Sequence, residues 1–198
     1  MEKDEKNYTA TVYVAAPGTP LLKSGGTSAA GHVYYSISDG DKHESYGFAP
    51  AEHGASSGPG KVYSSDVEDY KEPRYSRTMQ VSKEQYEKLQ EYGKSPDKHQ
   101  FDMQYSGTAN SCIDFTWGAL NHAGLHRKNL LDQEEKKFEG ALKPLDNIKE
   151  IKSIPAPFPN SELNQEKNNK MPDRTSLQWL LSEQQSGATT QARANPQD

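Results

Sequence analysis

Alternating polar and apolar positions predict several strands in the N-terminal half of the chain. Residues Thr9 to Ala15 alternate with the period of a half-buried strand. Two tyrosine-rich runs, His32 to Ser38 and His43 to Ala49, flank Asp39-Gly40-Asp41-Lys42, and an Asp-Gly pair between such runs is typical of a β-hairpin. Tyr75 to Val81 is a further strand-like run. These runs predict an antiparallel sheet.

A helix is predicted directly after the last of these runs. Ser82 and Gln85 have the spacing of a capping box, in which each side chain binds the other residue's backbone amide. The helix is expected to continue to about Tyr92 and to stop at Gly93 and Pro96, since glycine and proline commonly follow a helix end.

A second helix is predicted to begin at Cys112. A short strand over Phe101 to Tyr105 and the turn Ser106 to Asn110 precede it, and Gly124 marks its end. Its apolar residues line two adjacent helical faces, so the helix should be largely buried. These residues are Ile113, Trp117 and Leu120 on one face and Cys112, Phe115 and Ala119 on the next.

The remaining segments carry weaker patterns. Pro50 to Lys61 is rich in glycine, serine and proline and is expected to be a surface loop. Leu131 to Leu142 is charged and compatible with a helix, whereas Ile154 to Pro159 should be extended because of its prolines. Asp173 is expected to cap a short helix that carries leucines, and Ser186 to Asp198 has the composition of a disordered tail.

Composition limits the chain to one modest core. It has 198 residues, of which 32% are hydrophobic, and a mean hydropathy of -1.01. We therefore expect an α+β fold with one main domain over residues 8–160 and a C-terminal extension over 161–198. The net charge of -5 comes from interspersed charges without a basic stripe, so no nucleic-acid partner is expected.

Neither a membrane span nor a secretion signal is predicted. No run of 18 apolar residues occurs, so no integral membrane segment is expected. The segment Met1 to Asn7 carries charges of both signs and is not followed by an apolar stretch of signal-peptide length. We therefore expect synthesis in the cytoplasm without a signal peptide.

Cys112 is the only cysteine and the first candidate for chemistry. A helix start presents backbone amides without intrahelical partners and a partial positive charge, which together stabilise a thiolate. The competing interpretation is a small buried hydrophobe, which is the commonest role of a free cysteine. A lone cysteine can form neither an internal disulfide nor a cysteine-based zinc site.

A thiol nucleophile needs a base, a group that orients the base, and donors for the oxyanion. His32, at the head of its strand, is the predicted base, and the Cys112 backbone amide is the predicted oxyanion donor. The orienting group should lie on the neighbouring hairpin strand. Glu44 is the first choice, with Ser45 or His43 as alternatives, because the sequence does not fix the strand register.

The other polar residues near this pattern have simpler explanations. Asn110 suits the turn, and Asp114 suits the first turn of a helix. His53, His122 and His126 are weaker candidates for the base. The six histidines show no HExxH motif or comparable ligand spacing, so we expect neither a metal nor another cofactor.

The order of the two catalytic candidates resembles that of circularly permuted NlpC-type cysteine hydrolases. In that branch, which includes lecithin:retinol acyltransferase-like proteins, a strand histidine comes first, a polar residue follows about a dozen positions later, and an Asn-x-Cys helix comes last. The matching residues are His32, Glu44 and Asn110-Ser111-Cys112. The resemblance covers roughly Gly31 to Leu125 and implies a papain-like antiparallel sheet packed against the cysteine-bearing helix.

The same stretches are also similar to hydrolase domains of bacterial type VI secretion effectors. That resemblance implies hydrolysis of amide bonds in peptidoglycan peptides through a thioester, injection by a secretion apparatus into the target-cell periplasm, and a cognate immunity protein. Two alternatives stay open: an acyltransferase or thioesterase acting on lipids or proteins, and a non-enzymatic binding module with Cys112 in its core. A catalytic Cys112 should react with a thiol alkylator at neutral pH, whereas a core thiol should stay protected.

Overall fold

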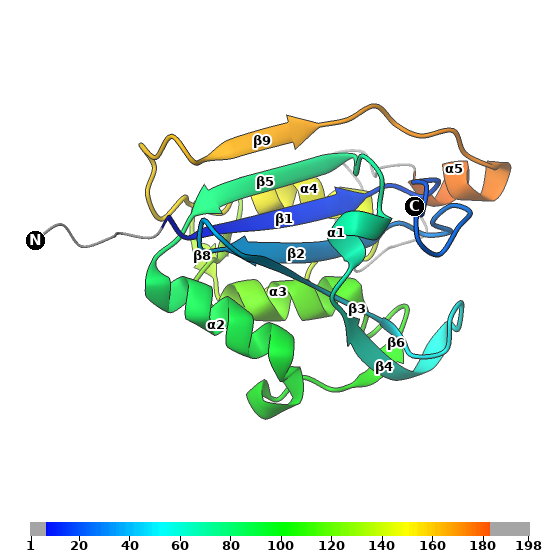
Figure 1. Ribbon diagram of the computed structural model, residues 1–198, viewed down its shortest axis with the longest axis horizontal. Coiled ribbons are helices and arrows are strands. Elements are labelled where there is room, and N and C mark those ends of the chain that lie inside the picture. Colours follow the sequence, from blue (N-terminus) through cyan, green and yellow to red (C-terminus); the bar gives the residue numbers. More distant parts are fainter. Residues whose placement is uncertain (1–6, 183–198) are drawn as a thin grey trace, which may run out of the picture.

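The computed structural model describes residues 7–182 and shows a seven-stranded antiparallel sheet of order β6-β4-β3-β2-β1-β5-β9 (Figure 1). This sheet and the helices that cover it confirm a mixed α+β fold. Its strands are β1 (Thr9–Ala15), β2 (His32–Ser38), β3 (His43–Pro50), β4 (Ser57–Tyr63), β5 (Tyr75–Gln80), β6 (Gln104–Ser106) and β9 (Gln165–Asn168).

The predicted hairpin is confirmed as β2 and β3. The two strands pair from Ser38 opposite His43 to Tyr35 opposite Tyr46. In the turn, the Asp39 carboxylate accepts hydrogen bonds from the Asp41 and Lys42 amides at 3.0 and 2.8 Å. An aspartate that binds the amides two and three residues further on stabilises a tight turn locally, so this register is encoded by the turn itself.

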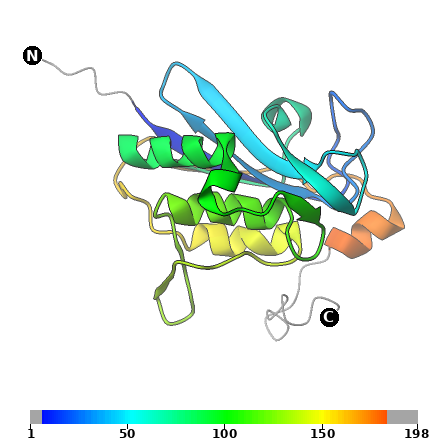
Figure 2. The same ribbon diagram turned by 90° about the horizontal axis from the view of Figure 1, so that it is seen from below.

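Helices α2 (Lys83–Lys94), α3 (Cys112–His122) and α4 (Asn147–Lys152) cover one face of the sheet (Figure 2), whereas the short α1 (Asp66–Asp69) lies on the other. The capping box predicted for α2 is present, with reciprocal bonds between Ser82 and Gln85. The helices are α1 (Asp66–Asp69), α2 (Lys83–Lys94), α3 (Cys112–His122), α4 (Asn147–Lys152) and α5 (Ser176–Ser182), with 3-10 turns η1 (Pro96–His99) and η2 (Pro144–Asp146).

Side-chain alternation along β2 explains how the two faces are covered. Tyr35 points toward α3 and stacks on Phe115 at 6.0 Å, whereas its neighbour Tyr34 points the other way and contacts Tyr70 at 5.3 Å. Trp117 of α3 is fully buried, and its Nε1–H donates to Asn147 Oδ1 at 3.0 Å. Each fully buried aromatic contributes about 1.5–3 kcal/mol, so Phe115 fixes α3 against β2 and Trp117 fixes it against α4.

The prediction of a surface loop over residues 50–61 was partly wrong, because β4 occupies its second half. β4 pairs with β3 and with β6 despite its glycines and proline. Gly60 is the physical reason: a Cβ there would overlap the Phe48 ring, so the missing side chain lets the two strands approach around a buried aromatic.

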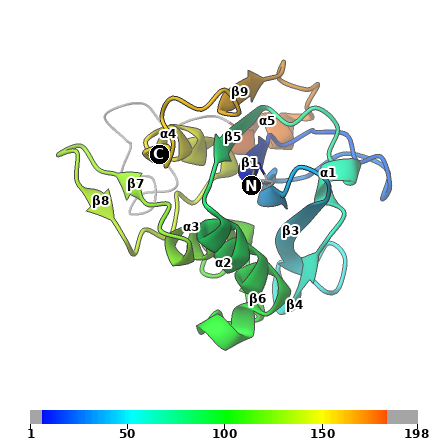
Figure 3. The same cartoon turned by 60° about the vertical axis from the view of Figure 1, so that its left-hand side comes forward.

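The charged segment 131–142 does not form a helix. It belongs to a small two-stranded ribbon of β7 (Arg127–Lys128) and β8 (Glu134–Glu135), which lies outside the main sheet (Figure 3). Arg127 Nη1 lies 2.7 Å from Glu135 Oε1 across the ribbon, and Asp132 turns the chain with a φ of 61°. Opposite charges therefore pair across two strands here, in place of the helix with which the segment is compatible.

The described part of the C-terminal extension contributes to the same sheet. β9 pairs with β5, and the short predicted helix is present as α5. Thr175 caps it instead of Asp173, since Thr175 and Gln178 exchange backbone-to-side-chain hydrogen bonds at 2.9 and 3.2 Å.

Residues 154–159 form bends and a turn instead of an extended segment, and the predicted tail 186–198 lies outside the described residues. Within residues 7–182, no helix is long and apolar enough to cross a bilayer.

Candidate active site

His32 lies at the first position of β2 and is held by a carboxylate. Its Nε2–H donates to Asp66 Oδ2 at 2.8 Å, and both side chains are buried. Asp66 is the first residue of α1, directly after β4. The bond leaves Nδ1 as the ring nitrogen that can serve a nucleophile and fixes the neutral tautomer with its proton on Nε2.

Cys112 is the first residue of α3, as the sequence predicts. Ser111 is the N-cap: its hydroxyl accepts from the Ile113 amide at 3.2 Å, and its own amide donates to Asp114 Oδ2 at 2.8 Å. This capping box fixes Ser111 as the last residue before the helix, so the helix begins at Cys112. The Cys112 amide is therefore in the first helical turn, where amides have no intrahelical acceptor.

The start of β2 and the start of α3 bring Cys112 and His32 together. The Val33 amide, next in sequence to His32, donates to Cys112 Sγ at 3.4 Å. The thiol also interacts electrostatically with the His32 ring. A backbone donor and the helix N-terminus both favour negative charge on the sulfur.

The surroundings of His32 favour the imidazolium. Burial by itself lowers the pKa of His32, whereas Tyr70, Asp66 and Cys112 raise it, and the net effect holds the pKa well above 6.5. Because Tyr70 keeps its proton at neutral pH, the Asp66 carboxylate is the charge that favours the imidazolium there. The buried Asp66 carboxylate is the partner that also hydrogen-bonds the ring. The site is thus suited to a thiolate–imidazolium pair.

Aromatic side chains enclose this pair. The His32 ring stacks with Tyr34 at 5.3 Å and with Tyr70 at 4.9 Å. Burial raises the pKa of Tyr70, and burial together with the Cys112 charge raises the pKa of Tyr105 to about 12. Both phenols therefore keep their protons at neutral pH, and Tyr105 can donate a hydrogen bond in the cleft that it lines together with Cys112.

A cleft of about 550 Å³ opens onto Cys112, His32 and Asp66. The loop that precedes β2 forms one wall, and the β3–β4 connection forms the other. Its lining combines apolar side chains such as Leu21 and Phe48 with polar ones such as Lys23. A small apolar cleft with convergent polar groups is the usual form of a site for a small or extended ligand.

The structure does not place Glu44 beside His32. Glu44 pairs with Ile37 near the far end of β2, accepts from Gln90 Nε2 at 2.7 Å, and lies 3.7 Å from Lys94 Nζ. The alternatives are also displaced along the hairpin: His43 is exposed opposite Ser38, and Ser45 pairs with Ser36. The expectation that a hairpin carboxylate would orient the histidine was therefore wrong.

Gly47 explains why the orienting group comes from elsewhere. A Cβ on Gly47 would overlap Asp66 Oδ2 and lie 2.8 Å from His32 Nε2. The hairpin strand thus leaves a gap beside the histidine, and α1 fills it with Asp66. Ser45 supports this arrangement, because its hydroxyl donates to the Ser64 carbonyl, two residues before Asp66, at 3.1 Å.

Asp66 was missed because β4 and α1 were not predicted. The spacing of Ser65 and Glu68 fits a capping box and is the sequence signal for a helix at this place, although Ser65 makes no side-chain cap bond. Without β4 in the sheet, the position of that helix beside His32 could not be derived.

Gly47→Ala is expected to displace the Asp66 carboxylate and so to remove most of the hydrolase activity that is proposed below. The added methyl group cannot coexist with the His32–Asp66 bond, so we expect a loss of about 10²-fold in kcat/KM. Gly107→Ala is the matched control, since a Cβ there has its nearest neighbour at 3.6 Å. Steady-state kinetics of the two variants would test this, and equal activities would contradict the role given to Gly47.

Of the other sequence candidates, only His53 shares the cleft with Cys112, whereas the rest have structural roles or lie apart from the thiol. His53 lines the cleft, whereas His126 Nδ1 contacts Asn121 Oδ1 at 2.8 Å. Asn110 holds the turn by donating to the Asp102 and Gln104 carbonyls at 2.6 and 2.8 Å. His122 lies at the opposite end of α3 from Cys112.

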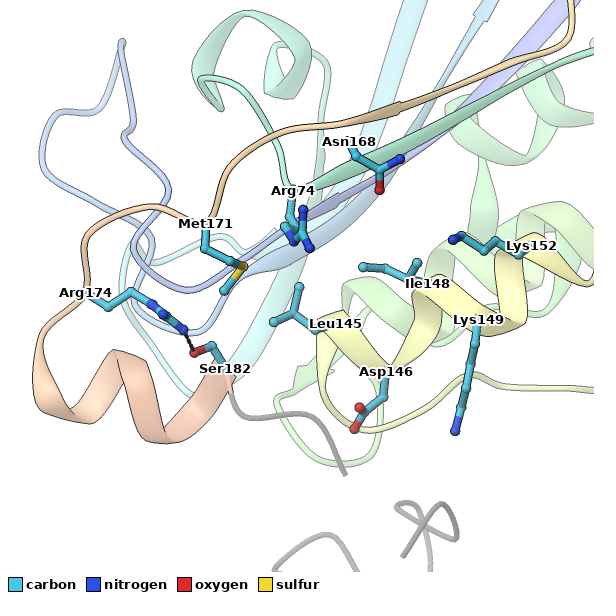
Figure 4. Close-up of a pocket in the computed structure, with 10 residues that line it drawn as sticks. All are labelled: Arg74, Leu145, Asp146, Ile148, Lys149, Lys152, Asn168, Met171, Arg174 and Ser182. Atoms are coloured by element: carbon cyan, nitrogen blue, oxygen red, sulfur yellow. Dashed lines mark hydrogen bonds between the residues drawn. The ribbon is translucent and has the colours of Figure 1, made fainter. Parts of the chain in front are cut away.

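A second cleft, of about 580 Å³, lies between α4 and the segment that connects β9 to α5 (Figure 4). It is lined by basic side chains that include Arg74, Lys149 and Arg174, and Arg174 donates to Ser182 Oγ at 2.5 Å. Neither Cys112 nor His32 lines it. Among the described residues that line this second cleft, no nucleophile lies beside a base, so the cleft at Cys112 is the candidate active site.

Comparison of the chain with protein-family models, curated proteins and solved structures found no match.

Proposed function

We propose that this protein is a cysteine hydrolase in which Cys112 is the nucleophile, His32 the general base and acid, and Asp66 the positioning residue. The observation that carries this proposal is the buried His32–Asp66 hydrogen bond beside a thiol at a helix N-terminus. The base lies between the nucleophile and the orienting group, which is the arrangement that nucleophilic catalysis requires. A cysteine that only filled the core would need neither the base nor the cleft.

The proposed reaction is hydrolysis of an amide bond in two steps. The Cys112 thiolate attacks the carbonyl carbon, and the C–N bond breaks as His32 transfers its proton to the leaving amine, which leaves a thioester. Water then attacks the thioester carbonyl while His32 accepts a proton from the water molecule. The C–S bond breaks, the carboxylic acid leaves, and the thiolate–imidazolium pair is restored.

The Cys112 amide and the Tyr105 hydroxyl are the proposed donors to the oxyanion. The first lies in the first turn of α3, and the second interacts electrostatically with Cys112 and keeps its proton. Donors fixed before the reaction stabilise the charge that develops on the carbonyl oxygen.

Tyr105→Phe should lower kcat by about 10²-fold, the usual effect of removing one oxyanion donor. Tyr63→Phe is a suitable control, because Tyr63 lines the same cleft and its hydroxyl instead donates to the Pro50 carbonyl at 2.9 Å. The ratio of the two kcat values measures the contribution of Tyr105. A ratio near one would exclude Tyr105 as a donor.

The proposed substrate is the peptide stem of peptidoglycan, cleaved as an amidase or endopeptidase. The support is the resemblance of the His32 and Cys112 segments to permuted NlpC-type domains of type VI secretion effectors. That resemblance also suggests a papain-like fold, delivery into the target-cell periplasm and a cognate immunity protein. The replacement of the expected Glu44 by Asp66 keeps a carboxylate on the histidine, so the proposed chemistry is unchanged.

Digestion of purified peptidoglycan, with the released fragments resolved by mass spectrometry, would test the substrate. We expect fragments with new free carboxyl and amino ends, absent after iodoacetamide treatment of the protein. Thioester and phospholipid substrates would be assayed in parallel. Turnover of those substrates without peptidoglycan fragments would replace the proposed substrate by an acyl group on a lipid or protein.

A further inference from the structure

Three metal-binding side chains lie together away from the cleft. Glu91 near the end of α2, His99 in η1 and His122 at the end of α3 each place one ligand atom within 4.8 Å of the other two. The two histidine rings are 4.4 Å apart between centroids. We call these three residues the histidine cluster. Glu91 and His99 are eight residues apart and His122 follows 23 residues later, so the three form no compact ligand motif in the sequence.

One ring nitrogen of the histidine cluster has no other partner. His122 Nε2 is shielded from solvent and makes no hydrogen bond within the described residues. A buried polar atom without a partner costs about 1–3 kcal/mol, a cost that a bound ligand would remove. The Tyr92 ring lies 5.8 Å from both histidine rings and holds them near each other.

We infer that Glu91, His99 and His122 form a binding site for one divalent transition-metal ion, with Zn²⁺ as the best match. Two imidazole nitrogens and one carboxylate oxygen are a common zinc ligand set, and water completes four-coordination. Ligand atoms on tetrahedral zinc lie about 3.4 Å apart, so the three side chains, whose ligand atoms lie within 4.8 Å of one another, have to close in on the ion.

The electrostatics of the cluster agree with this assignment. Burial, His99 and Lys88 lower the pKa of His122, while Glu91 opposes them. A lowered histidine pKa favours the neutral imidazole, which is the form that binds a metal. The positive charge of Lys88 opposes the binding of a metal ion. The Lys88 ammonium lies 3.2 Å from the Glu84 carboxylate, which offsets that charge.

The role of such an ion is structural. Cys112 and His122 are the first and last residues of α3, which separates them by about 15 Å along the helix axis. The ion would join α2, η1 and the end of α3, and it would hold the helix whose other end carries the nucleophile.

Zinc titration by calorimetry would test the site, using untagged Cys112→Ser protein so that the thiol does not bind the metal. We expect one Zn²⁺ per chain, and at least about tenfold weaker binding for His99→Gln and for His122→Gln. His43→Gln is the matched control, because His43 is an exposed histidine outside the cluster and its removal should leave the Kd unchanged.

Glu91→Gln guards against effects on folding, since Glu91 is exposed on α2 and its replacement leaves the core intact. It should weaken zinc binding while leaving the melting temperature of the metal-free protein unchanged. Absence of zinc binding by the parent protein, or equal binding by the His99 and His122 variants, would overturn the inference.

Discussion

Cys112→Ala should reduce amide hydrolysis by about 10⁴-fold or more, the effect expected when a covalent nucleophile is lost. The proposed reaction passes through a thioester to Cys112 Sγ, and no second thiol is available because the chain has only one cysteine. Release of fragments from peptidoglycan, or of product from a peptide substrate, measures the loss.

The control for this variant is the fold itself. Alanine keeps the helix start and its capping box, since Ser111 and Asp114 are unchanged. Melting temperature and circular dichroism should therefore stay close to those of the parent protein. A folded Cys112→Ala protein that retains more than a few per cent of the activity would show that another group is the nucleophile.

Asp66→Ala should lower kcat/KM by about 10²–10³-fold, because His32 loses the group that orients it and stabilises its charge. Asp66→Asn keeps a hydrogen-bond acceptor for Nε2–H but removes the negative charge. Burial lowers the pKa of His32, whereas Tyr70, Asp66 and Cys112 raise it. The pKa of His32 should therefore fall when the Asp66 charge is removed. The imidazolium is then lost at a lower pH, and the alkaline limb of the kcat/KM profile should move to lower pH.

Glu44→Gln is the matched control for Asp66→Asn, because it makes the same chemical change at the other candidate carboxylate. Glu44 binds Gln90 and Lys94 beside the hairpin turn, at the opposite end of β2 from His32, so its replacement should not change the pH profile. A shift caused by Glu44→Gln and not by Asp66→Asn would restore Glu44 as the orienting group and refute the assignment of Asp66.

Much of the fold could be predicted because local signals encode it. The Asp39-Gly40 turn and the Ser82–Gln85 capping box each act over a few residues, and both are present as predicted. β4 was missed because its pairing depends on Gly60 making room for Phe48, a contact between residues distant in sequence. Local composition indicates a loop there, and only the tertiary contact decides otherwise.

The candidate site likewise combines residues that local patterns predict with one residue that they do not. The positions of Cys112 at a helix start and of His32 at a strand start follow from local patterns, and the sheet brings them together. The partner of His32 could not be predicted in this way, because it depends on the gap at Gly47 and on the path of the chain from β4 into α1. Selecting a carboxylate by its distance in sequence led to Glu44 instead of Asp66.

The most direct test of a reactive Cys112 needs no knowledge of the substrate. The rate of Cys112 alkylation by iodoacetamide at pH 7 would be followed by mass spectrometry for the folded parent protein and for His32→Gln. A thiolate–imidazolium pair predicts rapid alkylation of the parent and a rate at least about tenfold lower without the imidazole. A parent protein whose Cys112 reacts only on unfolding, at a rate that His32→Gln leaves unchanged, would contradict a catalytic cysteine and favour a binding module with a core thiol.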